Sequence, residues 1–77
     1  MHSEIASVMV HVNEALDERA LQSLEDEICE EWAVVSVDHN PKHPHLLMVS
    51  YDSAITRSSS FMHQFQERGL HAQLVGL

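Results

Sequence analysis

The spacing of the apolar residues limits the fold of this chain more than any other feature of the sequence. Apolar residues alternate with polar ones in four segments, which predicts strands over residues 5–12, 32–39, 45–51 and 71–77. Between them, apolar residues recur every three or four positions from Leu16 to Glu31 and again from Ile55 to Phe65, which predicts two helices. The order βαββαβ is that of the α+β, ferredoxin-like fold. Right-handed crossovers then place both helices on one face of an antiparallel sheet with strand order 4-1-3-2.

Polar and special residues indicate where these elements begin and end. Asn13 or Asp17 is expected to cap the first helix, and Asp52-Ser53 the second. Gly69 stands where a helix usually ends in a left-handed residue. Strand alternation assigns the following residues to the side that faces the helices: Ala6, Val8, Val10, Val12, Val35, Val37, Leu47, Val49, Tyr51, Ala72 and Leu74. On the second helix, Ile55, Ser58, Phe61, Met62 and Phe65 are expected to face inward.

Length and charge narrow the classes of function. We expect one domain over residues 1–77, with a core too modest for an enclosed cleft. Four Lys or Arg against twelve Asp or Glu give a formal charge of -8, so nucleic acid and anionic membranes are poor partners. Cys29 is the single cysteine, and no secretory signal or membrane span is visible. These features favour a cytoplasmic protein.

Several stretches add a family likeness to this pattern. They are the valine-rich first strand and residues 35–38 (VSVD), 47–52 (LMVSYD) and 69–75 (GLHAQLV). With them the chain resembles the heavy-metal-associated domains, the family of copper chaperones and of the N-terminal modules of metal-exporting ATPases. The resemblance covers nearly the whole chain and implies the ferredoxin-like fold.

The metal motif of that family is missing. The family holds Cu(I) or a similar ion through Met-x-Cys-x-x-Cys between the first strand and the first helix, because thiolates are soft ligands. If Leu21 aligns with the first apolar helix position, Glu14 and Asp17 take the places of the two cysteines and Val12 that of the methionine. A shift by one residue also leaves no thiol there. The family's glycine after the first helix and its aromatic residue after the late glycine are replaced too. Thiolate transfer of Cu(I) is therefore not expected.

Histidines offer a different kind of metal site. Strand alternation puts His39, His43 and His45 on the helix side of the predicted hairpin, at the end of the sheet where Glu14 and Asp17 also lie. Imidazoles together with carboxylates suit Zn, Ni or Cu(II). The alternative is a solvated turn whose histidines are merely polar.

A second histidine pair is predicted on the face of the sheet without helices. His11 and His71 fall on adjacent strands near the same end. They would either join a metal site or remain two independent surface side chains.

The helix-free face is also a candidate interface. Its predicted apolar residues are Met9, Val34, Leu46, Met48, Val75 and Leu77. Such a patch often marks association, and we expect a homodimer or another protein partner there. The alternative is that these apolar groups are scattered and face water.

Other readings have less support. The acidic residues late in the first helix would suit a basic partner, although charge runs are usually solvated faces. No arrangement of nucleophile, base and oxyanion-forming turn is visible, so an enzyme is not expected. The leading hypothesis is a non-catalytic, metallochaperone-like binding module. Divalent-metal binding is the alternative, and a small-molecule-sensing domain is a third reading.

Overall fold

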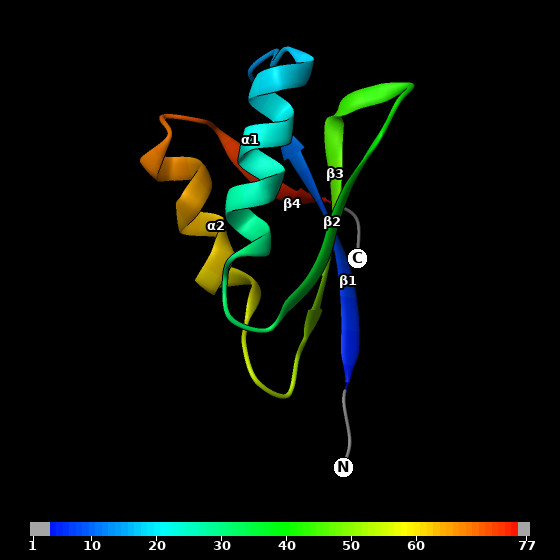
Figure 1. Cartoon of the computed structure of the whole chain (residues 1–77), viewed down its shortest axis with the longest axis vertical. Helices are drawn as coiled ribbons and strands as arrows, with labels where there is room; N and C mark the ends of the chain where they lie inside the picture. The colour runs from blue at the N-terminus through cyan, green and yellow to red at the C-terminus, as the bar shows by residue number, and fades with distance from the viewer. Residues whose placement is uncertain (1–3, 76–77) are drawn as a thin grey trace.

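The computed structural model describes residues 4–75 and confirms the predicted architecture. Its elements follow the order β1 (Ile5–Val12), α1 (Glu18–Cys29), β2 (Val34–Asn40), β3 (His43–Asp52), α2 (Ser58–Glu67) and β4 (Ala72–Val75). The four strands form one antiparallel sheet with the order β2-β3-β1-β4. Both helices lie on one face of this sheet (Figure 1). The last predicted strand is seen as far as Val75, and its remainder with Leu77 lies outside the described residues.

Helix α1 is held by a capping side chain and a buried stripe. The Asp17 carboxylate accepts a hydrogen bond from the backbone N–H of Ala20 at 2.7 Å, which satisfies one of the free donors at the helix start. Leu21, Leu24 and Ile28 are buried against the sheet. The helix is shorter at both ends than the sequence pattern predicts, because Leu16 packs against the core from the preceding loop, while Glu30 and Glu31 follow the last helical residue.

Helix α2 is anchored by two fully buried aromatic residues. Phe61 and Phe65 are 0% exposed, and the ring of Phe61 packs against that of Tyr51 with centroids 5.3 Å apart. Ile55 was predicted on this inner face, but it precedes the helix and is exposed. Asp52 was predicted as a helix cap, whereas its carboxylate accepts from the N–H of Ala54 within a turn.

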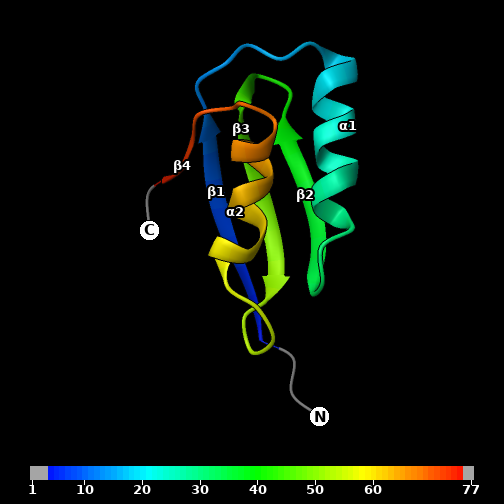
Figure 2. The same cartoon turned by 90° about the vertical axis from the view of Figure 1, so that its left-hand side faces the viewer.

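The inward side of the sheet matches the predicted alternation in β1 and β3. Val8, Val10, Val12, Leu47, Val49 and Tyr51 are all buried beneath the two helices, which Figure 2 shows in front of the sheet. Gly69 has φ 73°, so the predicted left-handed end after α2 is also confirmed.

An irregular start of β2 overturns two predictions. Val34 pairs with Tyr51 and Ser36 with Ser50, so Val35 is an extra residue in a β-bulge. Val34 therefore packs against the core, although it was predicted on the helix-free face. Val35 was predicted to face inward but is 59% exposed. The extra residue reverses the alternation that the sequence pattern assumes to be regular.

The sheet has two ends that differ in what surrounds them. At the hairpin end, β1 runs into α1, β2 turns into β3, and α2 leads into β4. At the far end lie the start of β1, the α1–β2 turn and the β3–α2 loop (Figures 1 and 2).

Candidate functional site

The loop between β1 and α1 is closed by a contact between Glu14 and His71. One carboxylate oxygen of Glu14 accepts from the backbone N–H of His71 at 2.7 Å, and the other lies 2.6 Å from His71 Nδ1. The backbone N–H of Asn13 donates to the carbonyl of His71 at 2.8 Å. The two carboxylates predicted at the cysteine places are thus both engaged within the protein, since Asp17 caps α1.

These contacts also set the charge of Glu14. Hydrogen bonds from the His71 side chain, and next from its backbone N–H, hold the pKa of the Glu14 carboxyl below its ordinary value of 4.5. Glu14 is therefore anionic at neutral pH, and its contact with His71 is charge-assisted.

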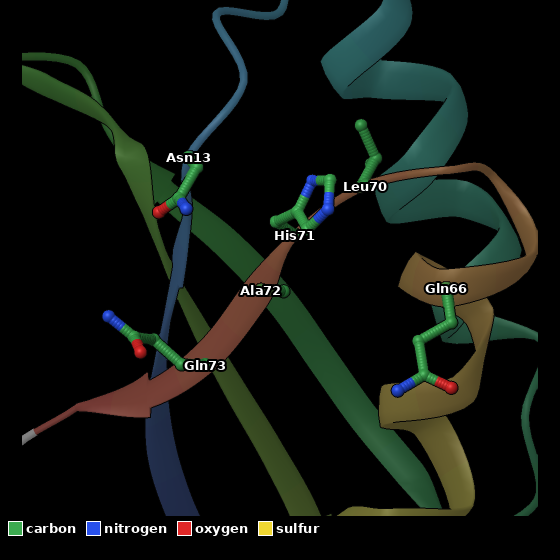
Figure 3. Close-up of a pocket in the computed structure, with 6 residues that line it drawn as sticks. All are labelled: Asn13, Gln66, Leu70, His71, Ala72 and Gln73. Atoms are coloured by element: carbon green, nitrogen blue, oxygen red, sulfur yellow. The ribbon is translucent and has the colours of Figure 1, made fainter.

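A shallow polar hollow lies beside this loop, between β4 and the end of α2 (Figure 3). Its volume is about 340 Å³, and the residues around it are Asn13, Gln66, Leu70, His71, Ala72 and Gln73. Three of these side chains are carboxamides, which both donate and accept hydrogen bonds. The residues around the hollow provide three carboxamides and the imidazole of His71, and no carboxylate.

His39 lies on the helix side of β2, as predicted, but its partner is on α1. Its Nδ1 is 2.9 Å from a carboxylate oxygen of Glu25, which is only 7% exposed. This contact fastens α1 to β2. Glu25 was interpreted as part of a solvated acidic face, yet its spacing after Leu21 and Leu24 places it on the buried stripe of the helix.

His45 and His11 form a stacked pair at the hairpin end. The ring centroids are 5.9 Å apart with planes inclined by 20°, and His45 Nδ1 lies 2.8 Å from the carbonyl oxygen of Val12. His45 thus contacts the end of β1 where the β1–β3 ladder stops at His11 and Leu46. Nδ1 of His11 is buried and has no hydrogen-bond partner in the part of the chain that the structure describes.

The predicted meeting of His39, His43 and His45 is not found. His39 contacts Glu25, His45 contacts Val12, and His43 is exposed in the hairpin. Within residues 4–75, no three His, Cys, Asp or Glu side chains are grouped so that they could hold a metal ion. The predicted pairing of His11 with His71 is likewise replaced by the His11–His45 and Glu14–His71 contacts.

The helix-free face carries a methionine pair. Met9 on β1 pairs with Met48 on β3, and the two side chains are 38% and 39% exposed. Leu46 and Val75 are half-buried on the same face. Met9, Leu46 and Met48 also line a cavity of about 230 Å³ at the edge toward β2. Of the six residues predicted for this interface, Met9, Leu46, Met48 and Val75 share this face, Val34 does not, and Leu77 lies outside the described residues.

Cys29 lies at the end of α1, far from the loop that contains Glu14 (Figure 2). It is a free, exposed cysteine. Partial desolvation, followed by the nearby carboxylates of Asp26, Glu25 and Asp38, raises the pKa of its thiol. Its sulfur is therefore distant from the loop that contains Glu14, and its thiol ionises less readily than an ordinary cysteine.

Comparison with known proteins places the fold clearly. The sequence matches no protein-family model. It also matches no curated protein. Among solved structures, oxidised MerP from Ralstonia metallidurans CH34 superimposes with a TM-score of 0.82 at 15% identity, covering 95% of this chain and 100% of that one. A CopA structure from Bacillus subtilis gives a TM-score of 0.80 at 19% identity and covers 100% of both chains.

A third structure, described as the CsoZ metallochaperone, gives a TM-score of 0.74 at 18% identity, covering 95% of this chain and 100% of that chain. These likenesses show that the chain has the ferredoxin-like fold of heavy-metal-associated domains. Neither helix within residues 4–75 is long and apolar enough to cross a membrane.

Proposed function

We propose that this chain is a non-catalytic binding module that has the metallochaperone fold but no thiolate site, and that acts through protein contacts. Its first partner is a second copy of itself, bound through the helix-free sheet face. The residues that would meet at this interface are Met9, Leu46, Met48 and Val75. A cytoplasmic location is part of the proposal.

The distribution of charge carries this proposal. Most of the acidic residues lie in α1, in α2 and in the loop before α1, whereas the strand residues of the helix-free face include only the carboxylates of Asp38 and Asp52. Two copies that approached through their helices would repel each other strongly at a net charge of -8. Two copies that meet through their sheets bring methionines together and keep the acidic helices apart.

The structural neighbours support a role related to metal handling. They include a copper-binding domain from HMA7, a P-type ATPase, and the CsoZ metallochaperone. In this chain, the residues at the predicted cysteine places supply only carboxylate oxygens, which are hard ligands and suit Cu(I) poorly. Association rather than thiolate exchange is therefore the function that this face and this loop support best.

Sedimentation equilibrium of the purified protein tests the proposal. We expect a reversible dimer. Met48→Glu should shift it to monomer, because the dimer interface would then bury an unpaired carboxylate from each copy. Leu74→Glu is the matched control, since Leu74 is 43% exposed but alternates to the helix side of β4. A wild-type protein that remains monomeric at millimolar concentration would overturn the proposal, as would equal effects of the two variants.

Divalent-metal binding is the second candidate, and the crowding of histidines at the hairpin end favours it. His11, His45, His71 and Glu14 are all placed there, on β1, β3 and the segments next to them. To bind a Zn, Ni or Cu(II) ion, His45 would have to release the carbonyl of Val12, and His71 would have to release Glu14. His39 and Asp17 have partners on α1, namely Glu25 and the first turn of the helix, and His43 is exposed in the hairpin, so none of these three belongs to the crowded group.

Calorimetric titration of the metal-free protein at pH 7.5 tests this candidate. We expect stoichiometric binding that weakens below about pH 6, where imidazoles protonate. Joint replacement of His45 and His71 by alanine should lower the affinity by about tenfold or more, whereas His63→Ala on α2 should not. Equal metal affinities of the double variant and of His63→Ala would contradict the assignment of His45 and His71 as ligands.

A further inference from the structure

Among residues 4–75, the four most exposed large apolar side chains all lie at the far end of the sheet. Trp32 is 77% exposed, Val35 59%, Ile5 54% and Ile55 52%, while the methionines of the helix-free face are below 40%. We call these four residues the far-end patch. They come from three separate segments of the chain and contribute little to the core.

Backbone hydrogen bonds around Asp52 bring the three segments together. Ile5 pairs with Asp52 across the β1–β3 ladder. The N–H of Asp52 donates to the carbonyl of Ala33 at 2.9 Å, and the N–H of Ile55 donates to the carbonyl of Asp52 at 3.1 Å. The patch is therefore built on a fixed backbone frame.

The fold itself does not require these side chains. The β-bulge makes Val35 an extra residue, and Trp32 stands in the turn between α1 and β2. An exposed tryptophan with aliphatic neighbours is typical of binding hot spots, because it buries a large area with few rotatable bonds. This end of the sheet also lies opposite the loop that contains Glu14.

Charge around the patch indicates what kind of partner fits. The segments that carry it, residues 4–5, 30–35 and 52–57, contain the carboxylates of Glu4, Glu30 and Asp52, and that of Glu31, which already accepts a hydrogen bond from Gln64 on α2. Arg57 is the single Lys or Arg in these segments. An apolar surface with an acidic rim complements a segment that alternates apolar and basic side chains, and the indole of Trp32 adds a cation–π surface for Lys or Arg.

We propose that the far-end patch docks a basic, apolar segment of a partner protein. A second copy of this chain is a poor occupant, because its own patch carries the same carboxylates. Ile5 shares the helix-free side of β1 with Met9 but lies at the far end of the strand, so this proposal rests on other residues than the methionines. The two surfaces would let the module hold a copy of itself and a different protein together.

Trp32 is the only tryptophan of the chain, so it reports directly on the patch. The probe is a synthetic peptide of alternating Lys and Leu, titrated at physiological salt, with a Glu and Leu peptide of equal length as its charge control. We expect the Lys and Leu peptide to shift the emission of Trp32 to shorter wavelength in a saturable way. The acidic peptide should leave the emission unchanged.

Two double variants distinguish peptide binding at the far-end patch from attraction by the overall negative charge. Val35→Ser combined with Ile55→Ser keeps Trp32 as the reporter. This double variant should lower the affinity for the peptide by about tenfold, a typical loss when interface anchors are removed. Met9→Ser combined with Met48→Ser removes apolar groups from the helix-free face and should leave peptide affinity unchanged. Circular dichroism confirms that both variants fold.

Three results would overturn the proposal. One is the absence of any saturable shift with the Lys and Leu peptide. Another is equal binding by the two double variants, which would mean that only the net charge of -8 attracts the peptide. The third is a tryptophan shift that depends on protein concentration without peptide, which would make a second copy the occupant. Loss of the dimer alone would affect only the function proposed for the helix-free face.

Discussion

The two ends of the sheet are held together by different kinds of contact. At the hairpin end, side chains from different elements contact each other, as in the Glu14–His71 and Glu25–His39 pairs. At the far end, backbone groups make the connections, and the large side chains of Trp32 and Val35 remain in water. Most polar residues at the hairpin end thus already have partners within the protein, whereas the exposed apolar residues at the far end can contact another molecule.

The largest expected effect concerns the buried contact toward the hairpin end. Glu25→Ala should lower the free energy of unfolding by about 2 kcal/mol, because a nearly buried charge-assisted hydrogen bond to His39 is lost. Urea denaturation at neutral pH measures it. Asp26→Ala is the matched control on the exposed side of α1 and should change stability by less than about 0.5 kcal/mol.

A loss from Glu25→Ala no larger than that from Asp26→Ala would contradict this view of the hairpin end. Its side-chain contacts would then be incidental, and the comparison between the two ends would fail.

The next effect tests the backbone of the far end. Ala33 has φ 68°, a left-handed conformation that strains any residue with a Cβ. Ala33→Gly should therefore raise the free energy of unfolding by about 1 kcal/mol. Gly69→Ala is the reverse change at φ 73°, where an added Cβ meets nothing within 4 Å, and it should cost about as much. Changes of the same sign in both variants would disprove strain as the cause.

The smallest effect is a pH dependence at the hairpin end. A group whose pKa is lower in the folded than in the unfolded state stabilises the fold above its unfolded pKa. That contribution is lost as the pH falls through the lower, folded value. Glu14→Gln should therefore reduce the urea midpoint at pH 6, and the difference from wild type should vanish well below pH 4.5. Glu67→Gln, at an exposed site on α2, serves as the control. A difference that persists unchanged at low pH would exclude the Glu14 carboxylate as its source.

The sequence predicts this fold well because its two kinds of periodicity are clean. Val8, Val10 and Val12 repeat at spacing two, while Leu21, Leu24 and Ile28 repeat at helical spacing, and the core is built from both sets. The prediction fails where one residue is inserted. The bulge at Val35 follows a left-handed alanine, and an alanine gives no sign of that conformation in the sequence.

The candidate sites were less predictable, since side-chain pairing depends on distances that spacing does not give. His39 and His45 were assigned to the correct end of the sheet, but not to their partners Glu25 and Val12. The far-end patch was missed for a different reason. Ile55 and Val35 were read as core residues by periodicity alone, and only their exposure reveals them.

The surroundings of Cys29 have a consequence for the reactivity of its thiol. Thiol–disulfide exchange proceeds through the thiolate, and a raised pKa keeps that form scarce at neutral pH. The exposed thiol of Cys29 should therefore exchange more slowly with oxidised glutathione than a thiol of ordinary pKa would.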